Sequence, residues 1–162
     1  MNLDTDGIIK KYFSQDNILV NHQIESYNYF VDVIIPKIIY QYFPVIINFN
    51  DSSCKIHQIK LNIINLDIGK PLLIENNGCS KLMTPTMART RNSTYLCPIN
   101  VDFQTEIMIN EGDTIVTLKD KIIPNITIGK IPIMVKSKYC ILGQKGIHDE
   151  CKYDLGGYFI IN

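Results

Sequence analysis

The sequence predicts an α+β protein in which N-terminal helices are followed by a mostly antiparallel sheet. Two patterns carry this prediction. Before Pro44 the apolar residues recur at helical spacing, and after Pro44 short segments rich in β-branched and aromatic residues alternate locally with polar ones. Loops rich in Gly and Asn separate these segments. The 162 residues show no internal repeat and no low-complexity linker, and they suffice for one domain with a core of its own.

The clearest helical pattern lies near the start of the chain. One face of the predicted helix carries apolar residues at spacings of four, three, four and three: Val20, Ile24, Tyr27, Val31 and Ile34. Pro36 is compatible with the first turn of a helix but not with its interior. A second short helix is therefore expected to start at a bend near Pro36 and to end at Pro44.

The strands are expected after Pro44, where β-branched and aromatic residues dominate. The predicted segments are residues 45–49, 55–64, 95–109, 114–118, 125–136 and 156–161. Two loops are expected between them, at residues 75–80 and 136–157, because Gly and Asn punctuate both stretches.

Composition limits the classes of function. The formal net charge is zero, so any binding to nucleic acid must come from a local patch rather than from bulk electrostatics. No apolar stretch is long enough to span a membrane, and the N-terminus lacks a signal-peptide pattern. The five cysteines are odd in number and show no framework, which favours reduced thiols inside a cell.

The common catalytic motifs are absent from the sequence, which has no nucleophile elbow, Walker phosphate loop or HExxH pair. GQKG at Gly143 to Gly146 is more typical of a turn than of a phosphate site. DTDG at Asp4 to Gly7 lacks the other oxygen ligands of a calcium loop and is interpreted as the start of a helix. A zinc site is an alternative, and it would use two separated pairs of ligands: Cys54, His57, His148 and Cys151.

The basic residues are more informative, because both arginines of the chain lie in the pentapeptide ARTRN. If that segment is extended, Arg89 and Arg91 point to the same face, where each could bind a phosphate or a carboxylate through two hydrogen bonds. An internal salt bridge or a subunit contact would explain them equally well. Lys136 and Lys138 share this spacing, and for them a solvated face is the simpler interpretation.

Four stretches together resemble one protein family. They are LVNHQIESYNYFVDVIIPKII, MARTRNSTYLCPINVDF, IGKIPIMVKSKYCIL and ECKYDLGGYFIIN, and they occur in the order in which the family carries them. This family is the second-largest, β-like subunit of multisubunit DNA-dependent RNA polymerases of the eukaryotic or large-DNA-virus type. The resemblance is to its N-terminal region, and it covers residues 16–49, 83–103 and 128–162.

The resemblance implies that residues 1–162 are the first segment of the protrusion, an incomplete α+β domain that contributes to the wall of the DNA cleft. The implied activity is nucleotidyl transfer by the complete polymerase, which uses Mg²⁺ and holds structural Zn²⁺, with no cofactor and no catalytic residue in this fragment. Implied partners are the rest of the subunit, the largest and other polymerase subunits, and DNA, but no membrane. The implied location is the nucleus or cytoplasm, or the virion for a large DNA virus.

On this resemblance the candidates for contact with DNA phosphates are Lys136, Lys138, Arg89 and Arg91. Gly156 and Gly157 are expected to serve a tight turn or a close approach of backbone.

The final segment Phe159–Asn162 is apolar, as in a buried strand, and an open strand edge there would need a partner. A split gene, an interrupted gene or a degenerate truncation would each explain such an end. We expect a separate polypeptide carrying the rest of the subunit to pair with residues 156–162. The alternative is a truncated standalone paralogue that docks onto a polymerase as an interaction or regulatory module.

Overall fold

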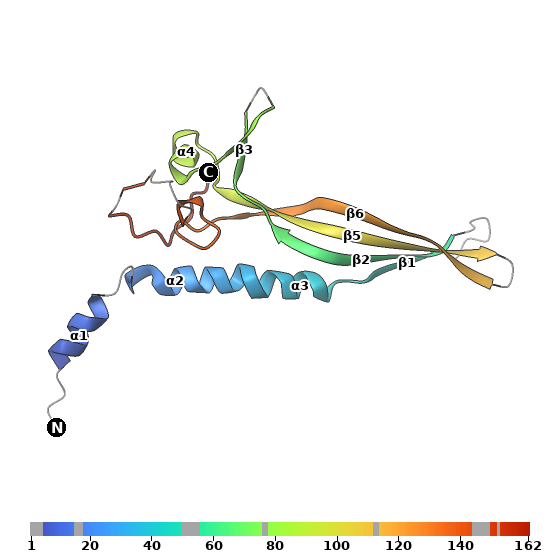
Figure 1. Ribbon diagram of the computed structural model, residues 1–162, viewed down its shortest axis with the longest axis horizontal. Coiled ribbons are helices and arrows are strands. Elements are labelled where there is room, and N and C mark those ends of the chain that lie inside the picture. The colour runs from blue at the N-terminus through green and yellow to red at the C-terminus, as the bar shows by residue number, and fades with distance from the viewer. Residues whose placement is uncertain are drawn as a thin grey trace. The chain divides into compact units, whose positions relative to one another are not determined.

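The computed structural model describes residues 5–14, 18–49, 56–75, 78–111, 114–143, 150–151 and 153–162. Figure 1 shows the elements in chain order. The helical elements are α1 (Thr5–Phe13), α2 (Ile18–Tyr29), a π-helical turn (Phe30–Ile34), α3 (Ile35–Gln41), α4 (Pro85–Thr90) and a 3₁₀ turn (Ile141–Gly143). The strands are β1 (Val45–Asn48), β2 (Ile56–Ile68), β3 (Leu72–Ile74), β4 (Ser80–Leu82), β5 (Leu96–Glu111) and β6 (Thr114–Pro132).

The predicted α+β class is confirmed. Three helices precede the first strand of the described chain, and the larger sheet has the strand order β1-β2-β5-β6. The β1–β2 and β2–β5 pairs are antiparallel, with Val45 opposite Leu61 and Leu61 opposite Thr105. A second, small antiparallel sheet joins β3 to β4.

The chain forms two compact units, and neither is continuous in sequence. The first comprises Met1–Val31, Pro71–Leu96 and Pro132–Asn162, and the second comprises Asp32–Lys70 and Cys97–Ile131. In the first unit the largest fully buried side chains include Tyr95, Ile133 and Ile141. All four stretches that carry the family resemblance contribute residues to the first unit.

The predicted helical stripe faces inward. Tyr27 and Val31 are buried, and Val20, Ile24 and Ile34 are partly buried, as the spacing predicts. The expected restart of the helix near Pro36 is observed, because a π-helical turn over Phe30–Ile34 separates α2 from α3 and Pro36 lies in the first turn of α3. Pro36 has no N–H to donate to the carbonyl four residues earlier, and a wider turn accommodates that missing bond.

The strands differ from the prediction at their ends. The segments predicted at 114–118 and 125–136 belong to one strand, β6, which stops at Pro132. Residues 156–161 do not form a strand, and their one bridge is an isolated antiparallel one, between Phe159 and Met134. The short elements β3, β4 and α4 were not predicted, because three to six residues are too few to establish a period.

The second unit has a sheet with one apolar and one polar face. Along β5, Ile99 and Val101 are buried, and the next residue on that face, Phe103, packs against Phe43 with tilted ring planes and ring centroids 5.7 Å apart. In the middle of β5 the alternate residues, from Asn100 to Glu106, are polar and pair across strands, as in the ion pair between Lys60 and Glu106 at 3.4 Å. This alternation is the period-two pattern that predicted the strand.

Candidate functional site

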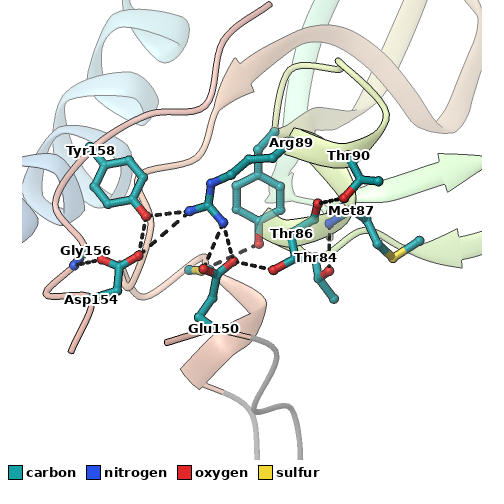
Figure 2. A network of polar contacts seen from close by, with 11 residues as sticks. Thr84, Thr86, Met87, Arg89, Thr90, Glu150, Asp154, Gly156 and Tyr158 are labelled. Atoms are coloured by element: carbon teal, nitrogen blue, oxygen red, sulfur yellow. Dashed lines mark hydrogen bonds and ion pairs between the residues drawn. The ribbon is translucent and has the colours of Figure 1, made fainter. Parts of the chain in front are cut away.

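The residues of the family motifs meet in the first unit, around the side chain of Arg89 (Figure 2). Arg89 comes from the ARTRN stretch, and it contacts Glu150, Asp154 and Tyr158 of the ECKYDLGGY stretch. Segments more than 60 residues apart in sequence are therefore joined by one group of polar side chains. We call Arg89, Glu150, Asp154 and Tyr158 the Arg89 network.

Local structure places Arg89 at the end of a short helix. Thr84 caps the N-terminus of α4 by accepting a hydrogen bond from the Met87 N–H at 3.2 Å, and Pro85 occupies the first turn. Ala88 is completely buried, which fixes the inner face of the helix. Arg89 then lies in the last turn, where a positive charge suits the helix C-terminus.

The guanidinium of Arg89 is bound on two sides. Its Nη1 donates to both carboxylate oxygens of Glu150, at 2.7 and 2.8 Å, and its Nη2 donates to the Tyr158 hydroxyl at 2.5 Å. The same Nη2 lies 3.8 Å from Oδ2 of Asp154. The hydroxyl of Thr86 also donates to Glu150, at 2.9 Å. This planar fork matches several acceptors at once, which a lysine could not do.

Asp154 accepts several of the hydrogen bonds in the Arg89 network. The Tyr158 hydroxyl donates to its carboxylate, and the Gly156 N–H donates to Oδ1 at 2.8 Å. The ammonium of Lys136 donates to the backbone carbonyl of Asp154 rather than to its side chain. These bonds tie the turn at residues 154–156 to the segment around Lys136.

The network shifts the pKa values of its members. Partial burial alone would lower the pKa of the Arg89 guanidinium, but the hydrogen bond and negative charge of Glu150 raise it. Burial together with the hydrogen bond to Asp154 raises the pKa of Tyr158 to about 12. Arg89 and Tyr158 therefore both stay protonated at neutral pH.

The pKa of the Asp154 carboxyl is lowered, although burial by itself would raise it. The hydrogen bonds from Tyr158 and Gly156 outweigh the burial, and the positive charges of Lys136 and Arg89 add to them. Both carboxylates of the network are engaged by donors and cations. This arrangement is suited to holding the segments together rather than to proton transfer.

Two backbone positions make this close approach possible. Gly156 has φ of +74°, and a Cβ there would lie 2.7 Å from the Val135 carbonyl oxygen and 2.8 Å from Cβ of Lys136. Lys136 itself adopts φ of +64°, which is uncommon for a residue with a side chain. The prediction that Gly156 serves a close backbone approach is confirmed.

Gly157 brings the final segment against α2. It has φ of +80°, and a Cβ there would lie 3.0 Å from Cβ of Val20 and 3.1 Å from Oε1 of Gln23. One turn further along the helix, the Tyr27 ring meets the Phe159 ring edge to face, with centroids 5.6 Å apart. The first family stretch therefore packs directly against the last one.

Backbone bonds hold the final segment on its other side. The N–H of Val135 donates to the Tyr158 carbonyl, the N–H of Gly157 donates to the Val135 carbonyl, and the N–H of Tyr95 donates to the Ile160 carbonyl, each at 2.9 Å. Gly157, Tyr158 and Ile160 therefore make backbone bonds within the chain itself, and the pairing of residues 156–162 with a separate polypeptide stays a prediction.

The predicted pairs of basic residues do not share a face in the way that an extended backbone would allow. Because α4 is helical, Arg89 enters the network while Arg91 lies after the helix, 3.7 Å from a carboxylate oxygen of Glu75. Residues 135–139 form turns rather than a strand. Lys136 bonds to Asp154, while the Lys138 ammonium is exposed above the Tyr139 ring, 5.6 Å from its centroid.

The internal salt bridge proposed as one explanation of the arginines is therefore observed for both, closely for Arg89 with Glu150 and more loosely for Arg91 with Glu75. Sequence reasoning did not identify Glu150, Asp154 and Tyr158 as the partners of Arg89. Their regular spacing of four residues could have drawn attention to them, but the segment is not helical, so no helical rule connects them.

The other candidate sites find less support. Within the described parts of the chain, no group of three or more His, Cys, Asp or Glu side chains could hold a metal ion. Of the four proposed zinc ligands, His57 lies on β2 and Cys151 is an exposed free thiol, while Cys54 and His148 lie outside the described residues. Most of the GQKG turn and Asp4 also lie outside them. No described helix is both long and apolar enough to cross a membrane.

Comparison with known proteins gives the family. The family model described as RNA polymerase beta subunit matches residues 18–162. The chain belongs to this family. The match extends over the helix α2, the Arg89 network and the final segment, which are the parts that the resemblance predicted.

Relatives of this family chain occur in eukaryotes, archaea and a large DNA virus. It is 31% identical to DNA-directed RNA polymerase II subunit 2 of Arabidopsis thaliana, over 98% of the chain and 14% of the relative. It is 34% identical to DNA-directed RNA polymerase subunit 2 of Acanthamoeba polyphaga mimivirus, over 96% of the chain and 13% of the relative. It is 32% identical to DNA-directed RNA polymerase subunit Rpo2N of Methanocaldococcus jannaschii, over 96% of the chain and 30% of the relative.

The chain therefore spans about one seventh of the length of the first two of these relatives. The part that it matches is their N-terminal region. This agrees with the predicted N-terminal fragment of a second-largest subunit.

Proposed function

We propose that residues 1–162 form the first segment of the protrusion domain in the second-largest subunit of a DNA-directed RNA polymerase, where they contribute to the wall of the DNA cleft. The observation that carries this proposal is the joining of the four family stretches in one unit by the Arg89 network and the final segment. On this proposal the segment supplies shape and surface, and nucleotidyl transfer with Mg²⁺ takes place elsewhere in the polymerase. It would act in the compartment in which its polymerase transcribes.

Co-purification tests this function. An affinity-tagged chain, expressed in its native cells or with the other polymerase subunits, should recover the largest subunit and the remainder of the second-largest subunit. The double variant Glu150→Ala, Asp154→Ala is compared with the unaltered chain. It leaves the Arg89 guanidinium without its carboxylates and should reduce the recovery of polymerase subunits. Recovery of no polymerase subunit by the unaltered chain would refute the proposal.

A second part of the proposal concerns DNA. All four basic candidates are cationic. Arg89 and Lys136 hold segments of the chain together through hydrogen bonds, whereas Arg91 is 48% exposed beside Glu75 and Lys138 is also exposed. We therefore assign the phosphate contacts first to Lys138 and Arg91, whose side chains are more exposed. Arg89 and Lys136 would mainly hold the backbone in place. Phosphate contacts do not depend on the DNA sequence, and they weaken as the salt concentration rises.

The salt dependence of DNA binding by the assembled polymerase tests this assignment. Replacing Lys138 and Arg91 together by Ala should make the slope of log K against log salt shallower by about 1.8, since each phosphate contact contributes about 0.9. The matched control is Lys81→Ala with Lys121→Ala, which removes the same charge from exposed positions on β4 and β6. An equal change of slope in both double variants would contradict the assignment.

A standalone interaction module remains the second candidate function. The in-chain bonds of the final segment favour it, because they already satisfy part of the strand edge that a partner was expected to pair. A module of this kind would be a soluble monomer that unfolds cooperatively when expressed alone.

A further inference from the structure

The larger sheet, in the second unit, ends in two different edges. Its strand order β1-β2-β5-β6 places β1 at one edge and β6 at the other (Figure 1). Along β6, Lys121, Pro124 and Lys130 are exposed, and Asn125 adopts φ of +57°. Charges, proline and irregular backbone are features by which edge strands avoid pairing with another strand. The four residues of β1 carry none of these features.

The segment around β1 is uncharged, apolar and exposed. Residues 38–50 contain no charged side chain. Ile46 and Ile47 are each 50% exposed. Five other large apolar side chains of this segment are also exposed: Ile38, Tyr40, Tyr42, Val45 and Phe49. Exposed apolar residues that gather in this way mark a contact site, and two copies of an uncharged segment can meet without like-charge repulsion.

One hydrogen bond shows which backbone groups of β1 face its neighbour β2. The N–H of Phe49 donates to the His57 carbonyl at 2.9 Å. The two strands are antiparallel with Ile47 opposite Ile59, and this register continues to Phe49 and His57. In an antiparallel pair only every second residue exchanges hydrogen bonds with the residue opposite. Phe49, Ile47 and Val45 therefore bond to β2.

The backbone groups that face away from β2 belong to Ile46 and Asn48. Among the strands that the structure describes, none pairs with this outer side of β1. Ile46 and Asn48 lie symmetrically about Ile47, so the edge is self-complementary. In an antiparallel pair of two copies centred on Ile47, Ile46 of each copy exchanges its hydrogen bonds with Asn48 of the other. Ile47 then lies opposite its own equivalent, at the kind of position where side chains come closest.

The faces of the sheet match in the same arrangement. Val45 and Ile47 lie opposite Leu61 and Ile59, on the apolar face of the sheet. In the centred pair, Val45 of one copy lies opposite Phe49 of the other, so the apolar face continues across the junction. The joined sheet ends in β6 on both sides, and the features of that edge oppose further addition. Association therefore closes at two copies.

We propose that two copies of the free chain join their β1 edges in an antiparallel, two-fold symmetric pair centred on Ile47. The second copy is the occupant that this edge fits, because an uncharged strand with symmetrically placed donors and acceptors satisfies itself in one register. The proposal goes beyond the proposed function, since it concerns the chain before it joins any other subunit.

A matched pair of variants tests the register. Ile47→Glu places like charges opposite each other, whereas Ile46→Glu faces the neutral Asn48 of the other copy. The two isoleucines are equally exposed, so both variants remove similar apolar surface. Sedimentation equilibrium of the full chain should show dimerisation weakened about tenfold or more by Ile47→Glu and about threefold or less by Ile46→Glu. Equal weakening by the two variants overturns the register.

A charge exchange tests whether position 47 meets itself. Ile47→Glu chain and Ile47→Lys chain should each sediment mainly as monomers, and an equal mixture of the two should sediment as a dimer, because opposite charges then face each other. A mixture that associates no more than its components overturns the proposal. If both variants also recover less of the polymerase in that case, the edge binds another polypeptide and not a second copy.

Hydrogen exchange of the unaltered chain needs no variant, and it decides the matter if the position-47 variants fail to fold. As the concentration rises, the amides of Ile46 and Asn48 should exchange more slowly, because they become bonded across the junction. The amide of Ile47 bonds to β2 in both states and should change little. Exchange at Ile46 and Asn48 that is independent of concentration overturns the dimer. Recovery of polymerase by the tagged chain is a separate measurement, so either proposal can fail while the other stands.

Discussion

Arg89 and Arg91 lie two positions apart, yet the structure gives them different surroundings. Arg89 makes hydrogen bonds to Glu150 and Tyr158 and lies near Asp154, whereas Arg91 has a single carboxylate at 3.7 Å and a side chain that is 48% exposed. An exposed single ion pair contributes little to stability, but a planar fork bound by several acceptors contributes more. The two positions should therefore respond differently to the same substitution.

Replacing Arg89 by Lys should lower the free energy of unfolding by about 1–3 kcal/mol, because an ammonium cannot bond both carboxylate oxygens and the Tyr158 hydroxyl at once. Urea unfolding followed by circular dichroism measures this change. Arg91→Lys is the matched control, and it should change the value by less than about 0.5 kcal/mol. Equal losses at the two positions would show that the network does not support the fold.

The pH dependence of stability should reflect Asp154 at low pH and Tyr158 at high pH. The pKa of Asp154 is lowered in the folded chain, so its contribution is present above the unfolded value near 3.9 and is lost as the pH falls through the folded value. The pKa of Tyr158 is raised to about 12, so its contribution is full below about 10 and is lost as the pH rises towards 12.

Urea unfolding at stepped pH tests the alkaline part directly. Tyr158→Phe removes the ionising hydroxyl, so its stability should decline less between about pH 10 and 12 than that of the unaltered chain. Tyr153→Phe is the control, because Tyr153 is 77% exposed. An alkaline decline that is the same in all three proteins would contradict the assignment to Tyr158.

At the scale of elements, the sequence predicts what repeats and misses what is short or depends on distant residues. The stripe from Val20 to Ile34 spans four turns, so its period identifies the helix and its buried face. The helix α4 has only six residues, and capping by Thr84 together with burial of Ala88 defines it. Neither the cap nor the buried alanine repeats along the sequence, so no periodic pattern predicts this helix.

The candidate site was harder to predict for the same reason. The motifs indicated which residues matter. Contacts between segments about 60 residues apart depend on tertiary packing, and the spacing of residues within one segment does not predict them. The assumption of an extended backbone at Arg89 and Lys136 was wrong because a helix and a turn occupy those places. The glycines were predictable, since only a narrow set of roles requires two of them in succession.

Gly156→Ala should destabilise the chain by about 1–3 kcal/mol or more, because a side chain at positive φ is strained and its Cβ would meet the Val135 carbonyl oxygen at 2.7 Å. Gly129→Ala in β6 is the matched control, since a Cβ there meets nothing within 4 Å. Thermal unfolding of both variants measures the difference. A smaller loss at Gly156 than at Gly129 would contradict the tight approach of residues 154–156 to the segment around Lys136.

At the scale of the whole molecule, two features favour association. Large apolar side chains are widely exposed, among them Ile74 at 75%, Tyr42 at 73% and Ile161 at 68%. The formal net charge is zero and the isoelectric point is near 6.8, so charge repulsion does not keep copies apart at neutral pH. Exposed apolar surface without charge repulsion favours association with another molecule.

The isolated chain should therefore self-associate as its concentration rises, and more strongly near pH 7 than near pH 9, where the net charge is negative. Sedimentation velocity across a concentration series at both pH values measures this. Co-expression with the remaining polymerase subunits should abolish the self-association, because the same apolar surfaces are then covered within the assembly. A chain that stays monomeric at every concentration and unfolds in one cooperative transition would instead favour the standalone module, because such a protein needs no polymerase to complete it.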